Sequence, residues 1–136
     1  MATLAARHAK DQRDTRLSTF LIAVVEDDES VLEALESLLE YAGYQVLLFL
    51  SAEDLLDSGR LHEVDFLITD IGLSGISGVE LLRILRIRRA DLPAVVITAR
   101  VELKQAALEA GARQVFLKPL DNSQLLDAIA IEAARG

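Results

Sequence analysis

The chain has 136 residues, a formal net charge of −8, no cysteine, and an apolar fraction of 51%. These values are typical of one globular domain with a sizeable core, and they exclude wholesale disorder, disulfides and cysteine-based metal sites or nucleophiles. The acidic balance argues against nucleic-acid binding driven by electrostatics.

The start of the chain has no apolar run long enough for a signal peptide or a membrane span. Residues 1–19 mix four basic with two acidic side chains. We therefore expect a flexible or weakly helical tail over residues 1–19, a single domain over residues 20–134, and a cytoplasmic protein with no membrane partner.

The first strand is predicted at residues 20–25 (FLIAVV), a short apolar run rich in β-branched residues. A helix is expected over residues 30–43, where apolar residues recur at helical spacing. Ser30 and Glu33 are expected to form its capping box. Residues 44–49 (YQVLLF) are then predicted to form the second strand.

A short helix is predicted from Ser51 to Gly59, and the third strand over residues 64–69 (VDFLIT). The next helix is expected over residues 78–89, with Ser77 and Glu80 as its capping box. It ends in a basic run, RILRIRR. Cations late in a helix complement its dipole and face water, so we do not assign this run to nucleic acid.

The remaining predicted elements are a strand, a helix, a strand and a helix at residues 93–98, 102–111, 114–117 and 122–134. The last helix is expected to begin at Asp121 or Asn122. Five strands that alternate with helices and are apolar on both faces predict an α/β domain. It should be a three-layer, doubly wound (βα)5 fold with a parallel sheet.

Polar side chains follow four of the five predicted strands. They are the acidic run Glu26, Asp27, Asp28 and Glu29, then Asp70, then Thr98, and finally Lys118. In a parallel sheet of this kind, the carboxyl ends of the strands lie at one edge, where ligands bind. Each residue alone is more simply a helix cap, a turn residue or a surface lysine, but together they favour a site.

Three carboxylates about 5 Å apart repel one another by roughly 3 kcal/mol per pair at an effective dielectric constant of about 20. Lys118 would supply one compensating charge, and Mg²⁺, which prefers oxygen ligands, would supply two more. Such a site suits an anionic tetrahedral group. We therefore predict phosphoryl transfer onto Asp70, since a carboxylate can act as a nucleophile and form an aspartyl-phosphate.

These residues resemble the receiver domain of two-component response regulators, over residues 20–134. The resemblance is carried by VVEDDESV after the first strand, LITD…SGISGVELL around the third, VVITA at the fourth and GARQVFLKPL around the fifth. It implies a flavodoxin-like sheet in the order 2-1-3-4-5. It also implies that a histidine kinase or phosphotransfer protein phosphorylates Asp70, and that the chain catalyses only its own phosphorylation and dephosphorylation.

The resemblance also implies roles for the other polar residues at this edge. The metal pair should directly end the first strand, which selects Glu26 and Asp27, with Asp27 as the closer ligand and Asp28 as the second choice. The further expected participants are the Gly72 carbonyl as a metal ligand, Thr98 and the Ala99 amide on the phosphoryl group, and Lys118 paired with it. A cis peptide is expected between Lys118 and Pro119.

The chain departs from the family pattern in three places. Ser74 stands where the loop after the phosphorylated residue usually has proline. Val115 stands where the fifth strand usually has Tyr or Phe, and Phe116 should point to the opposite face. The segment from Thr98 to Gly111 is about two residues shorter than is typical. We expect intact phosphorylation chemistry but an altered readout of the signal.

The readout is expected on the face formed by the fourth helix, the fifth strand and the fifth helix. This face could serve a homodimer or a downstream protein, with Val115, Phe116 and Leu120 as candidate contacts. A pseudo-receiver, which binds partners without phosphorylation, is the main alternative. A phosphohydrolase would want a second Asp where Gly72 stands, and a dinucleotide-binding protein would need the G-x-G-x-x-G spacing.

Overall fold

The computed structural model describes residues 19–135, so the predicted tail lies outside the described residues except for Thr19. The predicted alternation of strands and helices is confirmed. In chain order the elements are β1 (Leu21–Val25), α3 (Glu29–Tyr41), β2 (Gln45–Phe49), α4 (Ala52–Asp57), η1 (Leu61–Glu63), β3 (Phe66–Asp70), α5 (Gly78–Arg88), β4 (Ala94–Thr98), η2 (Val101–Leu103), α6 (Lys104–Ala110), β5 (Gln114–Leu117) and α7 (Asn122–Arg135).

The five strands form one parallel sheet in the order β2-β1-β3-β4-β5, as the resemblance implied. All residues of β1 and β4 are buried, whereas the edge strands β2 and β5 are partly exposed. The continuous apolar runs of the central strands are buried because helices cover both faces of the sheet.

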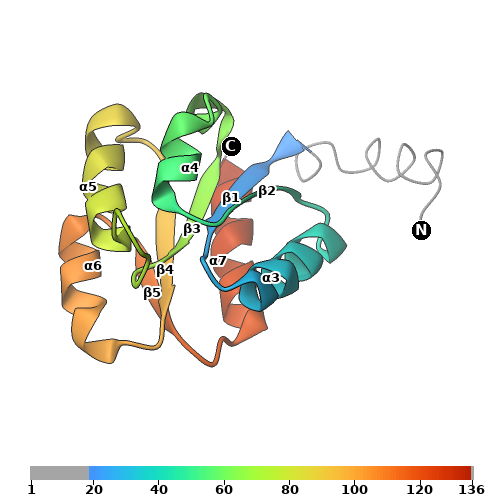
Figure 1. Cartoon of the computed structure of the whole chain (residues 1–136). Coiled ribbons are helices and arrows are strands. Elements are labelled where there is room, and N and C mark those ends of the chain that lie inside the picture. The colour runs from blue at the N-terminus through green and yellow to red at the C-terminus, as the bar shows by residue number, and fades with distance from the viewer. Residues whose placement is uncertain (1–18, 136) are drawn as a thin grey trace.

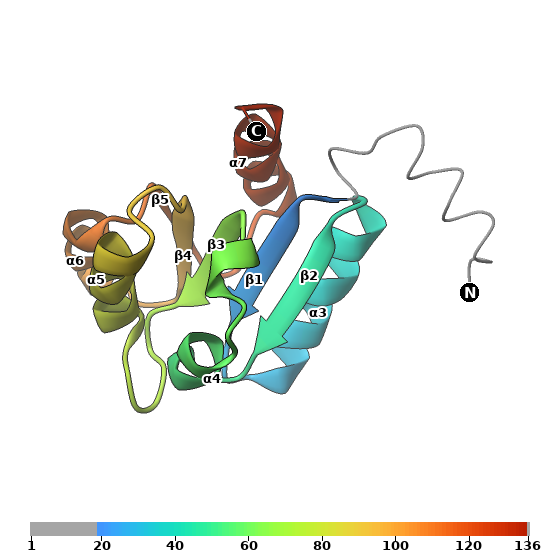
Figure 2. The same cartoon turned by 90° about the horizontal axis from the view of Figure 1, so that it is seen from above.

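The helices divide between the two faces (Figures 1 and 2). Helices α4, α5 and α6 enclose one apolar core, and α3 and α7 enclose the other. Val115 packs toward the first core and Phe116 belongs to the second, which confirms that they point to opposite faces. Phe116 is only 8% exposed, so it is a core residue rather than a surface contact. Within residues 19–135, no helix combines the length and apolar character needed to cross a membrane.

The start of α3 differs from the prediction. Asp28, not Ser30, is the N-cap: its Oδ1 accepts hydrogen bonds from the backbone N–H groups of Ser30 and Val31, at 2.9 and 3.3 Å. The helix therefore begins at Glu29. Because four acidic residues precede the helix, the carboxylate nearest to the turn satisfies the free amides before the Ser30 hydroxyl can.

The predicted starts of the other helices are mostly correct. Ser51 caps α4, Ser77 caps α5, and Asp121 accepts from the amides of Ser123 and Gln124 at the start of α7. The prediction was wrong for α6. It begins at Lys104 after the short 3₁₀ turn η2, because the residue before it, Leu103, offers no side-chain cap.

Candidate functional site

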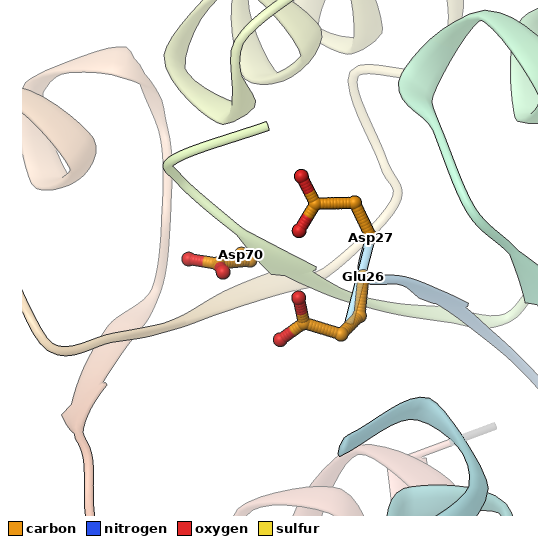
Figure 3. A group of neighbouring side chains, drawn as sticks. All are labelled: Glu26, Asp27 and Asp70. Atoms are coloured by element: carbon orange, nitrogen blue, oxygen red, sulfur yellow. The ribbon is translucent and has the colours of Figure 1, made fainter. Parts of the chain in front are cut away.

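Strand register brings the acidic residues together at the carboxyl edge of the sheet. Val25, the last residue of β1, pairs with Thr69 of β3, so Glu26 follows β1 at the level where Asp70 ends β3. Glu26, Asp27 and Asp70 each place a carboxylate oxygen within 4.8 Å of the other two. Figure 3 shows the three side chains gathered beside the ends of these strands.

Lys118 reaches this cluster from the other side of β4. Its backbone N–H donates to the carbonyl of Thr98, at 2.9 Å, which places the residue directly after β5. Its Nζ donates to Glu26 Oε1 at 3.1 Å and to Asp70 Oδ2 at 3.3 Å. The ammonium group therefore joins two of the three carboxylates. The predicted cis peptide between Lys118 and Pro119 is confirmed.

The electrostatics of the cluster favour a further cation. Glu26 is 3% exposed, and burial raises the pKa of its carboxyl although Lys118 and the Asp28 amide oppose the rise. Burial acts to lower the pKa of Lys118, but the Glu26 hydrogen bond and the charge of Asp70 outweigh it, so that pKa is raised. Three carboxylates and one ammonium leave a formal charge of −2. Because every donor is an oxygen, the residues fit Mg²⁺.

The carboxylate of Asp70 has a defined orientation. Its Oδ1 accepts hydrogen bonds from the backbone N–H groups of Ile71 and Gly72, at 2.6 and 3.3 Å, while Oδ2 accepts from Lys118. The start of α5 packs directly behind it. A Cβ on Gly78 would lie 2.3 Å from the Asp70 carbonyl oxygen, closer than atoms can approach. The side chain is thus held at the edge and remains 14% exposed.

Thr98 and Ala99 lie at the same edge, at the end of β4. Thr98 directly follows Ile97, which pairs with Asp70 across the strands. It is 1% exposed, and its hydroxyl oxygen accepts a hydrogen bond from the Arg100 N–H at 3.0 Å. Ala99 is exposed. The hydroxyl proton of Thr98 is not used in the bond to Arg100 and is available for donation.

Asp28, the second choice for the metal pair, lies outside the carboxylate cluster. Hydrogen bonds from the Ser30 hydroxyl and from the amides of Val31 and Ser30 lower the pKa of its carboxyl. Its backbone N–H donates to Glu26 Oε2 at 3.1 Å. Asp28 therefore caps α3 and supports Glu26, while Glu26 and Asp27 face Asp70.

One contact to this region was missed from the sequence. Glu53, near the start of α4, accepts a hydrogen bond from the backbone N–H of Ile76 in the loop after Asp70. The sequence showed no polar residue at the end of the second strand comparable with those after the others. Glu53 comes four residues after that strand, inside a helix, and no motif marks it.

Comparisons with known proteins agree with this geometry. A family model described as the response regulator receiver domain matches residues 22–130. Transcriptional regulatory protein FixJ of Azorhizobium caulinodans is 34% identical over 116 residues, which are 84% of this chain and 55% of FixJ. Sensory/regulatory protein RpfC of Xanthomonas campestris pv. campestris is 35% identical over 121 residues, which are 85% of this chain and 17% of RpfC. The chain thus spans about half of the first relative and less of the second.

Solved structures give the same result. A crystal structure of a CheY-like response regulator receiver domain protein from Methanospirillum hungatei superposes with a TM-score of 0.79 and 27% sequence identity. The superposition covers 87% of this chain and 96% of that one. The similarity therefore extends over the whole sheet and its covering helices.

Proposed function

The chain belongs to the response regulator receiver domain family, and on this basis we propose that Asp70 accepts a phosphoryl group from a sensor histidine kinase or a phosphotransfer protein. The receiver would comprise residues 20–134. The observation that carries the proposal is the convergence of three carboxylates and the Lys118 ammonium at one sheet edge. No structural cap or turn requires that set.

In the proposed reaction a carboxylate oxygen of Asp70 attacks the phosphorus of a phosphohistidine. A P–O bond forms while the P–N bond breaks, and the imidazole nitrogen keeps the electron pair and takes a proton from water. Lys118 would neutralise charge on the phosphoryl oxygens, and the Thr98 hydroxyl and Ala99 amide would donate to them.

Glu26, Asp27, Asp70 and the Gly72 carbonyl would hold Mg²⁺. When bound, the ion supplies positive charge beside the transferred group. The three carboxylates are close enough to share one cation. The chain would act in the cytoplasm, and we propose no direct binding to nucleic acid or to a membrane.

The signal would be read on the face of α6, β5 and α7, by a second copy or by a downstream protein. A phosphoaspartate adds negative charge and acceptor oxygens next to Thr98, which would draw the loop before α6 toward the site. Val115 packs against the core on the α6 side, where the family usually has an aromatic ring. We therefore propose that the readout works without a moving ring. Inward movement of an aromatic side chain of β5 on phosphorylation would contradict this.

The test is the intact mass of the protein after incubation with Mg²⁺ and acetyl phosphate, with Asp70→Asn as the control. We expect the wild type to gain one phosphoryl group and the variant to gain none. The gain should also disappear when a chelator removes the metal. A folded wild type that binds Mg²⁺ but gains no mass would contradict phosphorylation. It would favour a pseudo-receiver that signals by binding alone, which the departures at Ser74 and Val115 make the second candidate.

A further inference from the structure

The loop from residue 71 to residue 77 must hold its shape without proline. It begins with two residues whose side chains enter the core, Ile71 at 3% and Leu73 at 7% exposed. Between and after them lie glycines at 72 and 75 and an exposed serine at 74. Glycine-rich backbone has many accessible conformations. The middle of the loop therefore needs a contact from another element to have one conformation.

Glu53 provides such a contact from the first turn of α4. Its two carboxylate oxygens lie 3.4 and 3.3 Å from the backbone nitrogen of Ile76, which donates to them. Gly75 has a φ of +75°, and a Cβ built there would lie 2.2 Å from Glu53 Oε2. The carboxylate occupies the space that a side chain at position 75 would need. A left-handed residue followed by an inward N–H forms a concavity that accepts anions.

We propose that Glu53 is a positioning residue for the cation at the carboxylate cluster. By holding Gly75 and Ile76 it limits the conformations of the loop, and through the loop it sets the direction of the Gly72 carbonyl. The Gly72 N–H already donates to Asp70 Oδ1, so a displaced loop would also disturb that carboxylate. This inference rests on the proposed function, since it concerns the same Mg²⁺ site.

The experiment compares Mg²⁺ affinity, measured by calorimetric titration, in wild type, Glu53→Ala, Glu53→Gln and Asp54→Ala. Asp54 is the matched control because it is the next residue of α4 and exposed, and its removal changes the net charge equally. We expect Glu53→Ala to weaken binding several-fold, toward the lower end of the about 10- to 100-fold losses seen when residues that orient metal ligands are removed. Glu53→Gln keeps one acceptor oxygen and should restore part of the affinity, and Asp54→Ala should match the wild type.

Amide hydrogen exchange in the metal-free protein gives an independent measurement. The Ile76 amide should exchange faster in Glu53→Ala than in the wild type and in Asp54→Ala. Equal Mg²⁺ affinity in wild type and Glu53→Ala would overturn the positioning role, as would an equal loss in Asp54→Ala. A folded wild type that binds no Mg²⁺ would instead contradict the proposed function itself, with every variant equally inactive in the titration.

Discussion

At the scale of single residues, Glu26 shows how the site stores unfavourable charge. Its carboxylate is almost fully buried and has two hydrogen-bond donors, the Lys118 ammonium and the Asp28 amide. Burial nevertheless raises its pKa, because a carboxylate loses its hydration when it is buried. A raised pKa means that the folded state binds a proton more tightly than the unfolded state. The ionised form of Glu26 is therefore destabilising at neutral pH.

This predicts a pH-dependent effect of Glu26→Gln in metal-free buffer. Below the unfolded pKa both states carry a proton at Glu26, so a neutral Gln should change the thermal midpoint little at about pH 4. As the pH rises through the folded pKa, the wild type loses the stability that the proton provides. At about pH 7 the variant should thus have the higher thermal midpoint by calorimetry. A difference that is the same at both pH values would contradict the raised pKa.

At the scale of secondary-structure elements, the helix starts position the site. Asp28 caps α3 and donates its amide to Glu26, so the start of that helix also fixes the first acid of the cluster. The start of α5 does the same for Asp70. Gly78 is its first residue, and its N–H donates to the Ile71 carbonyl at 3.1 Å. Only a residue without a side chain can pack this closely behind the Asp70 backbone.

We therefore predict that Gly78→Ala destabilises the protein. The new Cβ would meet backbone atoms, the Asp70 carbonyl oxygen at 2.3 Å and the Ile71 Cα at 2.7 Å, neither of which can move as a flexible side chain could. The free energy of unfolding in urea should fall by about 1–3 kcal/mol, the usual cost of overpacking.

Gly72→Ala is the matched control for that substitution. It lies in the same loop region, and a Cβ there would have no atom within 4 Å. Its effect on the free energy of unfolding should be within about 0.5 kcal/mol of zero, as for most surface changes. Equal losses in both variants would show that the close approach behind Asp70 is not the cause.

At the scale of the whole molecule, the cluster joins separate parts of the sheet. Glu26 follows β1, Asp70 ends β3 and Lys118 follows β5. These strands carry both apolar cores, one on each face. A cation held at the cluster would therefore bind only when the sheet is assembled, and its binding energy would add to the stability of the whole fold.

Mg²⁺ should accordingly raise the thermal midpoint of the wild type. A ligand at a hundredfold excess over its Kd stabilises the folded state by about 2.7 kcal/mol. Asp27→Ala should remove most of this shift, because Asp27 is exposed and belongs to the cluster. Asp57→Ala, an exposed acid at the end of α4 outside the cluster, should keep it. The same shift with Na⁺ at equal ionic strength would mean screening rather than a site.

Most of the architecture could be predicted because its signals are local. The five strands were placed within two residues of their observed bounds, since apolar runs and helical spacing are read directly along the chain. The sheet order came from the resemblance rather than from these patterns. The start of α3 was predicted wrongly because Ser30 and Asp28 are both good caps, and the path of the chain after β1 decides between them.

What the sequence by itself determined is therefore the alternation of strands and helices, and the sheet edge at which the polar residues gather. Tertiary structure alone decided which acids face Asp70, that Lys118 bridges two of them, and that Glu53 contacts the loop beyond. The physical reason is that hydrophobic burial follows a periodic pattern along the chain. Distances between charged side chains depend instead on strand register and loop backbone, which bring together residues far apart in sequence.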